Sequence, residues 1–560
     1  MNRRTFLGTS SLLLSASTVF SRSSEMQCDV AVIGAGTGGY AAALSALRNG
    51  MRVVLTEETD WIGGQLTAQG VPPDEHAWIE DFGCTLSYRE FREGVREYYR
   101  QHLPLTAEAR SRRNLNPGNG TVSRLTHDPR VGLAVLESRL ASYVVSGQLV
   151  LLLRHVPVKA EITGDRVSSV TVHDVNADRD KVVIARYFVD ATETGELLPL
   201  THTEFVTGAE SQKVTGEPHA PAEAQARNVQ SFTFCFAIDY LAGEDHTIDR
   251  PSDYAFWRDY VPKLRPPWTG KLLSWTCAHP ETLQPREAIF DPRSSSRRGR
   301  ELNLWIYRRI ADPANFVPGT LRSAITLVNW PQNDYWLGDI LSASALDRQK
   351  FLVQAKQLSL SWLYWMQTDA PRVDGGTGWK GLRLRADVLG TDDGLAKYPY
   401  IRESRRIEAE FTVLEQHVGT EARMKATGKS GDEVGAAAFN DSVGIGCYRL
   451  DLHPATGGDN YIDISSLPFQ IPMGSLIPKR VENLLAGCKN LGVTHITNGC
   501  YRLHPVEWNI GEAAGAIAAH AIRTGESPRH LRNNPKNLAD LQANLRAQGF
   551  ELEWPRIHPV

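Results

Sequence analysis

Residues 29–57 place a glycine-rich turn between two short apolar segments, and this arrangement restricts the fold more than any other feature of the sequence. The segment DVAVI (29–33) has the composition of a buried β-strand, and the turn GAGTGG (34–39) follows it directly. The next residues, YAAALSALRNG, have a small-residue helix pattern, and MRVVLTE has the pattern of a second strand. This order of strand, G-x-G-x-x-G turn, helix and strand predicts the βαβ unit that binds dinucleotides.

Each residue of this unit has a physical role in the prediction. Gly34 permits the tight turn, Gly36 lets the backbone approach a pyrophosphate, and Gly39 lets the helix and strand pack closely. The pyrophosphate is expected at the helix N-terminus, where free N–H groups and the helix dipole favour negative charge. Glu57 can accept hydrogen bonds from ribose hydroxyls, and Glu58 is the alternative for that role. The predicted dinucleotide-binding residues here are Gly34, Gly36, Thr37, Gly38, Gly39, Glu57 and Glu58.

Residues 61–67 (WIGGQLT) follow and resemble a segment of flavoproteins in the glutathione-reductase-like superfamily. In those proteins the paired glycines lie along the pyrophosphate and ribityl chain of FAD, because backbone without Cβ atoms can pass close to the cofactor. The resemblance implies that Gly63, Gly64 and Gln65 contact FAD. An ordinary loop turn is the alternative for this segment.

Three later segments extend the resemblance. Residues 151–172 have the pattern of a strand meander, and the resemblance implies backbone contact with adenine at Val156 or Val158. Residues 185–200 (ARYFVDATETGELLPL) resemble the family's strand ending in Asp-Ala-Thr-Gly, which implies FAD contacts for Ala191 and Thr192. Glu193 stands where the family has glycine, so the path of this loop is left open.

The closing segment contains NLLAG (483–487) and GEAAG (511–515), which resemble the last FAD motif of the family. The resemblance implies a helix beginning near Gly511, with N–H groups at Gly511 and Glu512 stabilising the reduced flavin ring. A buried helix with a small-residue packing face is the alternative.

Through IGGQLT and NLLAGC the chain resembles secreted bacterial FAD-dependent oxidoreductases of that superfamily, over residues 28–215 and 465–530. The resemblance implies non-covalent FAD. Fumarate-reductase-type relatives attach FAD through a histidine after the paired glycines, but this chain has QLT at 65–67, and His76 lies too far along.

The predicted fold class is α/β, a Rossmann-like FAD-binding domain of glutathione-reductase type interrupted by an α+β substrate domain. The 560-residue length predicts more than one domain. Residues 26–215 and 466–530 form the two parts of the FAD domain, and 216–465 form the substrate domain, where strand and helix patterns no longer alternate. Residues 531–560 form a C-terminal packing helix and tail, with leucines 538, 541 and 545 on one helical face.

Residues 1–25 are predicted to be a twin-arginine signal peptide, because NRRTFL (2–7) resembles that export motif and residues 12–20 are apolar. A disordered or membrane-surface start is the alternative. This route carries folded proteins with their cofactor inside, so the Tat export machinery is an expected partner and the expected location is periplasmic or extracellular. No later run of 18 apolar residues predicts a membrane span in the mature chain.

Charge and cysteine usage exclude other classes of protein. The formal net charge is −3 and no basic stripe is present, so no nucleic-acid partner is expected. The seven cysteines include no C-x-x-C pair, which argues against a zinc cluster or a dithiol redox pair, and no metal site is predicted.

The segment KYPYIRESRRIEAEF (397–411) is the densest polar cluster in the predicted substrate domain. Tyr400, Arg402 and Arg405 are its candidate substrate-binding residues, since arginine can grip a carboxylate with two parallel hydrogen bonds. The favoured alternative is a helix over residues 401–414 on whose surface Arg405 pairs with Glu408 and Arg406 with Glu410.

His495, Arg502 and His504 are the candidate catalytic residues, because in this fold the connection between the last FAD strand and helix passes near the flavin ring. Histidine suits proton transfer near neutral pH, and Arg502 suits support of flavin or substrate charge. Weaker candidates are Tyr448, Asp451 and His453.

We therefore expect an FAD-dependent oxidoreductase that transfers a hydride from a C–H beside O or N of a small molecule to flavin N5. A sugar, an amine and a hydroxy acid all remain open as substrates, and the electron acceptor is unknown. We find no second G-x-G-x-x-G turn placed for NAD(P)H, so a pyridine-nucleotide reductase is less favoured. The alternatives are a non-redox FAD enzyme, such as a hydratase or isomerase, and a surface binding protein with a vestigial flavin fold.

Overall fold

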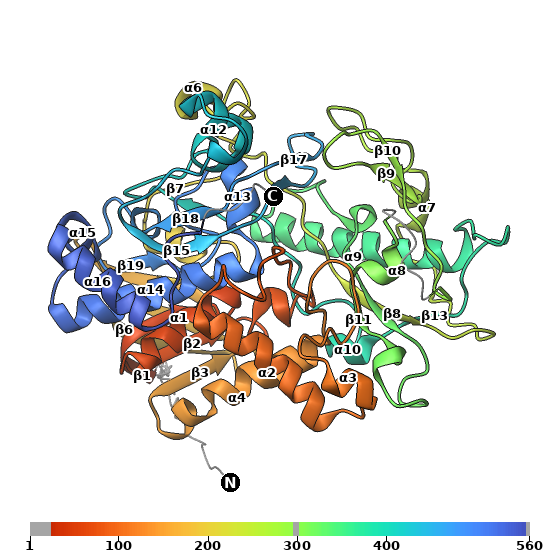
Figure 1. Cartoon of the computed structure of the whole chain (residues 1–560), viewed down its shortest axis with the longest axis horizontal. Helices are drawn as coiled ribbons and strands as arrows, with labels where there is room; N and C mark the ends of the chain where they lie inside the picture. Colours follow the sequence, from red (N-terminus) through yellow and green to blue (C-terminus); the bar gives the residue numbers. More distant parts are fainter. Residues whose placement is uncertain (1–23, 295–301, 556–560) are drawn as a thin grey trace, which may run out of the picture.

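The computed structural model describes residues 24–294 and 302–555 (Figure 1). The predicted signal peptide lies outside these residues apart from its last two positions, and so do residues 556–560 of the predicted tail. None of the helices within the described ranges is both long and apolar enough to cross a membrane.

The predicted βαβ unit is confirmed. It consists of β1 (Ser24–Ile33), α1 (Thr37–Arg48) and β2 (Val53–Glu57), and β1 and β2 are parallel. The glycine turn connects β1 to α1, so the N-terminus of α1 lies at the carboxyl end of β1. Ligands of open α/β sheets bind at this edge.

A seven-stranded sheet contains this unit in the order β3-β2-β1-β6-β5-β4, with β19 beside β6. β1, β2, β3, β6 and β19 run parallel, whereas β4, β5 and β6 form the predicted antiparallel meander. The added strands are β3 (Leu149–Leu153), β4 (His155–Thr163), β5 (Arg166–Asp174), β6 (Arg179–Asp190) and β19 (Leu484–Ala486). The chain is therefore mixed α/β around a parallel sheet.

Helix α14 (His504–Thr524) lies against α1 beside this sheet (Figure 1). A Cβ atom on Gly511 would lie 1.8 Å from the Gly38 carbonyl oxygen, and one on Gly515 would lie 2.1 Å from the Ala42 carbonyl oxygen. Glycine is required at both places because the two backbones touch. The predicted helix start near Gly511 is wrong: α14 begins at His504, where Pro505 occupies its first turn, as proline often does.

A second, antiparallel sheet belongs to the other half of the molecule, drawn in green in Figure 1. Its order is β11 (Arg309–Ala311), β12 (Ile325–Val328), β8 (Phe236–Tyr240) and β13 (Leu382–Leu384). Helix α9 (Ala345–Thr368) packs beside it, and the core there is rich in buried tryptophan: Trp257, Trp305, Trp330, Trp362 and Trp379.

The two halves have separate hydrophobic cores, and these cores bear on the predicted boundary at residue 465. The second core draws on residues 229–401 and on Tyr461. Ile407, Val418 and Leu450 instead belong to the first core, together with the parallel sheet. The continuous part of the chain that forms the second core thus ends near residue 401, and Tyr461 returns to that core later in the chain.

The remaining elements connect and cover these two sheets. The helices are α2 (Leu86–His102), α3 (Ala107–Ser111), α4 (Pro129–Val145), α5 (Leu197–Leu200), α6 (Gln212–Thr215), α7 (Tyr254–Asp259), α8 (Leu304–Tyr307), α10 (Ala386–Leu389), α11 (Glu415–Val418), α12 (Thr420–Thr427), α13 (His495–Tyr501), α15 (Pro528–Asn533) and α16 (Pro535–Ala547). The strands are β7 (Phe205–Val206), β9 (Thr276–Ala278), β10 (Pro285–Glu287), β14 (Arg406–Ile407), β15 (Ser442–Gly446), β16 (Leu450–Leu452), β17 (Ile462–Ile464) and β18 (Phe469–Pro472). The predicted C-terminal packing helix is confirmed as α16, which buries Leu541 and Leu545.

The helix expected over residues 401–414 is absent. This segment is extended and contributes the short strand β14. Arg402 and Arg406 are almost fully buried, and both bond to backbone carbonyls of other segments, Ser231 for Arg402 and Gly208 for Arg406. Tertiary partners therefore override the helical spacing of the sequence.

Candidate cofactor and substrate sites

A cavity of about 440 Å³ opens at the carboxyl ends of β1, β2 and β6. It unites residues predicted from separate motifs. Of these, Gly34, Gly36, Glu57, Glu58, Gly64, Ala191 and Thr192 line the cavity. His155, Pro157, Glu196 and Tyr398 also line it; all four lie in segments noted in the sequence, but none was predicted to contact the cofactor. We refer to it as the dinucleotide cavity.

The glycines of the turn are required by close approaches. Gly34 has φ +95°, and its Cβ would lie 2.4 Å from the Ala191 carbonyl oxygen. A Cβ on Gly39 would lie 1.8 Å from the Gly34 carbonyl oxygen. Gly36 and Gly64 instead border the cavity, and a Cβ on Gly36 would lie 2.7 Å from Glu193 Oε1. Bare backbone at Gly36 and Gly64 fits a pyrophosphate lying beside the N-terminus of α1.

Two carboxylates face the same cavity from the end of β2. Glu57 accepts hydrogen bonds from the backbone N–H groups of Ala35 at 3.1 Å and Thr59 at 2.9 Å. Burial raises the pKa of Glu57 to about 7 and that of Glu58 to about 8. Buried carboxylates gain from further hydrogen-bond donors, so ribose hydroxyls fit this end of the cavity.

Glu193 belongs to a buried charge cluster, and this resolves the loop path that the sequence left open. Lys489 Nζ lies 2.6 Å from Glu193 Oε2 and 3.3 Å from Glu507 Oε2. The Gly38 backbone N–H donates to Glu507 at 3.4 Å, and Gln65 Nε2 donates to it at 2.9 Å. The Lys489 side chain has no exposed area, and no sequence motif indicated it.

Other predicted cofactor residues support this geometry or lie outside it. Thr37 Oγ1 donates to the Gly63 carbonyl at 3.1 Å, which ties the turn to the paired glycines. Val158 is 45% exposed and does not line the cavity. Glu512, two residues before the middle of α14, accepts a hydrogen bond from Ser87 and does not line the cavity. With α14 starting at His504, Gly511 and Glu512 are packing residues within the helix.

A second, wider cavity lies between the two halves of the molecule, with an empty volume of about 1000 Å³ including its open mouth. We refer to it as the substrate cavity. Three predicted residues line it, namely Tyr400, Arg402 and Arg502. The weaker candidates Tyr448, Asp451 and His453 line it as well, as do Asp74, Tyr307 and Arg308, which the sequence did not indicate.

His453 forms a hydrogen-bonded pair in this cavity. Its Nδ1 lies 2.6 Å from Oδ2 of Asp334, whose carboxylate is fully buried, and its Nε2 lies 3.6 Å from Asp451 Oδ2. The Asp334 carboxylate can only accept, so it assigns the proton to Nδ1 and leaves the Nε2 lone pair for another group. This is the arrangement of a histidine positioned for proton transfer.

Arg502 closes one side of the substrate cavity. Its Nη2 donates to Asp451 Oδ2 at 3.0 Å, and its Nη1 donates to the Tyr400 hydroxyl at 3.4 Å. Burial alone would raise the pKa of Asp451, but His453 in its protonated form, together with Arg502, outweighs that effect and holds the pKa of Asp451 well below its usual range. The Arg502 carbonyl also accepts from Gln65 Nε2 at 2.9 Å, which connects Arg502 to the residue that follows the paired glycines.

The other predicted residues lie away from the substrate cavity. Arg405 donates to the carbonyls of Thr194 and Leu341 instead of lining it. His495 Nδ1 lies 2.9 Å from Glu403 Oε2 in a buried ion pair outside both cavities. His504 is fully buried, and burial lowers its pKa to about 3. The structure thus places Arg405 outside the substrate cavity and gives the two histidines buried contacts with protein groups.

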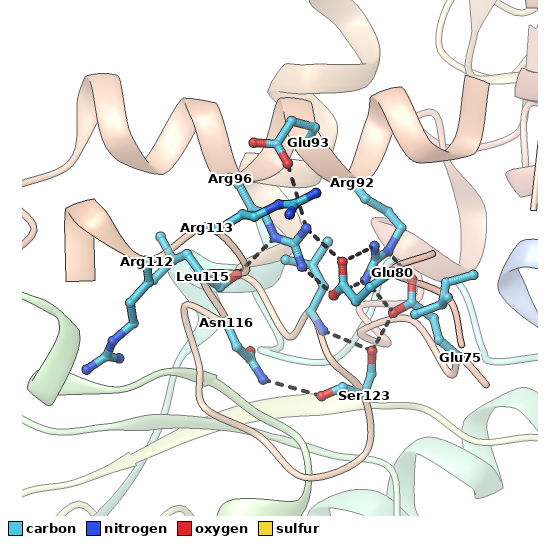
Figure 2. A network of polar contacts seen from close by, with 12 residues as sticks. Glu75, Glu80, Arg92, Glu93, Arg96, Arg112, Arg113, Leu115, Asn116 and Ser123 are labelled. Carbon is cyan, nitrogen blue, oxygen red and sulfur yellow. Dashed lines mark hydrogen bonds and ion pairs between the residues drawn. The ribbon is translucent and has the colours of Figure 1, made fainter. Parts of the chain in front are cut away.

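A polar network holds the segment that carries Asp74 (Figure 2). Arg92, on α2, donates from Nε to Glu75 at 2.8 Å and from Nη2 to Glu80 at 2.8 Å. Arg96, one turn along, donates to Glu80 at 2.6 Å. The side chains of Arg92 and Glu75 are almost fully buried. Because Glu75 is clamped, the neighbouring Asp74 is fixed at the edge of the substrate cavity.

The fold and the dinucleotide cavity define a protein that binds a dinucleotide at the carboxyl edge of a parallel sheet. The sequence profile of the FAD-dependent oxidoreductase family matches residues 29–545, and the chain belongs to that family. FAD is therefore its cofactor, and the carboxylates and bare glycines of the dinucleotide cavity fit it.

Individual relatives match smaller parts of the chain. A stretch of 53 residues is 53% identical to dihydrolipoyl dehydrogenase of Chlorobaculum parvum, covering 10% of this chain and 11% of that protein. Glycerol-3-phosphate dehydrogenase from Bacillus halodurans complexed with FAD is 15% identical over 38% of this chain and 40% of its own, with TM-score 0.22. The flavin-dependent monooxygenase PieE, with FAD and substrate, is 14% identical over 38% of this chain and 35% of its own, with TM-score 0.22. The family assignment rests on the profile match.

Proposed function

We propose that this protein oxidises a small molecule by removing a hydride from a C–H beside O or N, with a sugar, an amine or a hydroxy acid as substrate. FAD, when bound, supplies the hydride acceptor, N5 of its ring. The observation that carries the proposal is the Asp334–His453 pair in a cavity linked through Gln65 to the dinucleotide turn.

In this proposal the residues of the substrate cavity have separate roles. Nε2 of His453 takes the proton from the substrate O–H or N–H as the C–H bond loses its hydride, giving a carbonyl or imine. Asp334 holds the imidazole in the required tautomer and stabilises its protonated form. Arg502 and the Tyr400 hydroxyl hold the substrate oxygen or nitrogen beside them.

We also propose that FAD is bound non-covalently in a domain of glutathione-reductase type. The antiparallel meander between the first and last parallel strands supports the domain type. His76, the histidine nearest the paired glycines in the chain, has its Nε2 3.1 Å from the Gly83 carbonyl and packs against Trp554, which supports non-covalent binding. Export through the twin-arginine route to the periplasm or beyond remains a proposal from the sequence, as does reoxidation by oxygen, a quinone or an electron carrier.

The test uses the protein purified without residues 1–24. Visible flavin absorbance that moves to the supernatant after acid precipitation is expected for non-covalent FAD, whereas absorbance in the pellet contradicts it. Under anaerobic conditions, sugars, amines and hydroxy acids are then added, and bleaching by one class supports the oxidation. Turnover without bleaching favours the hydratase or isomerase alternative. A purified protein that does not bind added FAD favours the alternative of a surface binding protein with a vestigial flavin fold.

A further inference from the structure

Arg308 lines the substrate cavity between α8 and β11, and its guanidinium has unusually weak partners. Its side chain is 10% exposed, yet its contacts with Asp74 are long, from 3.3 to 3.4 Å. Its Nε has no hydrogen-bond partner among the described residues. A buried guanidinium without short hydrogen bonds is costly, and such a group commonly awaits a ligand.

The other arginines of the cavity separate into two groups. Arg402, Arg449 and Arg502 each have a carboxylate oxygen within 3.0 Å, from Asp334, Asp463 and Asp451 respectively. Arg286, on β10, has no ion pair within residues 24–294 and 302–555. Arg286 thus supplies positive charge without an ion pair among the described residues, whereas the counter-ion of Arg308, Asp74, makes only the longer contacts given above.

Both of these arginines line the substrate cavity together with Tyr307. The Arg308 guanidinium carbon lies 5.1 Å from the centre of the Tyr307 ring. The positive charges of Arg286 and Arg308 therefore belong to one cavity.

Aromatic groups form the rest of the cavity wall around these charges. Tyr448, Tyr461 and Trp330 line it, and the Tyr461 hydroxyl and Trp330 Nε1 have no hydrogen-bond partner in the part of the chain that the structure describes. A ligand here meets flat apolar faces together with unused donors.

We propose that the substrate is an organic acid whose carboxylate is bound by Arg308 and Arg286 in the substrate cavity. This inference rests on the proposed function only in naming the ligand as the substrate. A carboxylate matches a guanidinium with two parallel hydrogen bonds, and the aromatic wall accommodates its carbon skeleton. His453 lines the same cavity, so an acid held at Arg308 has its other end available to the proton acceptor.

The test measures binding to the oxidised, FAD-loaded protein by titration calorimetry, so that no turnover is needed. The probes are matched acids and amides, namely benzoate with benzamide and mandelate with mandelamide, together with inorganic phosphate. At least one acid is expected to bind ten-fold or more tightly than its amide. Equal affinity of both acids and their amides, or no binding of either acid, overturns the proposal. Phosphate binding more tightly than both acids replaces it with a phosphate site.

Variants locate the binding to the arginines. Arg286→Gln is expected to weaken acid binding three-fold or more, and Arg308→Gln ten-fold or more. Because Arg308→Gln leaves Asp74 without its cation, the charge-neutral pair Asp74→Asn with Arg308→Gln is measured as well and is expected to lose the preference for the acid. Arg383→Gln is the matched control, because Arg383 pairs with Asp239 in the same half but does not line the cavity. An unchanged acid preference in Arg286→Gln and the double variant overturns the assignment. Benzoate has no C–H beside O or N, so it is expected to bind without bleaching the flavin. Binding of mandelate without bleaching instead counts against the proposed function and leaves the acid site intact.

Discussion

The backbone N–H of Asp74 donates a hydrogen bond to Nδ1 of His504 at 3.0 Å. This contact assigns the His504 proton to Nε2, which has no hydrogen-bond partner within the described residues. Burial, reinforced by the nearby charge of Arg308, lowers the pKa of His504 to about 3. His504 is thus a neutral imidazole that accepts the Asp74 hydrogen bond and joins the start of α14 to the edge of the substrate cavity. The geometry favours His453 over His504 as the proton acceptor.

The two histidines give opposite predictions. His453→Gln is expected to retain FAD and slow its reduction by substrate by roughly 100-fold or more, because it removes a general base. His504→Gln is expected to change that rate less than ten-fold while lowering the free energy of unfolding, since it alters a buried hydrogen bond. Anaerobic stopped-flow absorbance and urea unfolding measure the two effects. A slow His504→Gln variant beside a fast His453→Gln variant would reverse the assignment.

Gly36→Val is expected to abolish FAD binding. A Cβ at this position would lie 2.7 Å from Glu193 Oε1 and would occupy the edge of the dinucleotide cavity. Gly435→Ala is the matched control, because the space around Gly435 is open and its backbone does not require glycine. The flavin-to-protein absorbance ratio after purification is the measurement. Full flavin content in folded Gly36→Val would remove this turn from the FAD site.

Lys489→Met is expected to lower the free energy of unfolding by about 3–5 kcal/mol. The substitution leaves the buried carboxylates of Glu193 and Glu507 without their cation. Adding Glu193→Gln is expected to recover part of the loss, because one of the two carboxylates is then neutral. Urea unfolding of the single and double variants measures this coupling. Independent, additive effects would show that the cluster does not act as a unit.

The parts of the site that local sequence determines were predictable, and those assembled from distant segments were not. The turn at Gly34 and Gly36 and the acidic end of β2 at Glu57 follow one another within a single βαβ unit, so their spacing carried the information. Arg308 and Asp334 reach the substrate cavity and its histidine from different segments, and no periodicity joins them. Lys489 likewise had no local signal.

Two predictions about helices were wrong, and the sequence shows the physical reasons only in part. The helix start at Gly511 was inferred from small residues, which α14 uses to pack on α1, whereas His504 and Pro505 held the actual start signal. The helix over residues 401–414 had suitable spacing, but burial of Arg402 and Arg406 against distant carbonyls made an extended path more favourable. In both cases the local sequence pattern was compatible with more than one backbone conformation, and tertiary packing determined which one formed.

The buried pair of His495 and Glu403 predicts a pH dependence of stability. Burial alone would lower the pKa of His495, but Glu403 outweighs it, so the pKa of His495 is raised above 6.5. Burial would raise the pKa of Glu403, but His495 and Arg406 lower it to about 2. Arg406 bonds to Glu403, and Glu210 accepts the His495 backbone N–H, so these groups complete the charged surroundings.

The sign of each contribution follows from linkage. The stabilisation from His495 is complete below pH 6.5 and is lost as pH rises through its raised pKa, whereas that from Glu403 is complete above pH 4.5 and is lost as pH falls toward 2. We therefore expect the pair to contribute most between pH 4.5 and 6.5. The difference in unfolding free energy between the wild type and His495→Gln should shrink steadily above that window. Taking the difference cancels the carboxyl groups that titrate near neutral pH in both proteins, such as Glu57. Urea unfolding at a series of pH values measures it, and a constant difference would mean that the pKa of His495 is the same in the folded and unfolded protein.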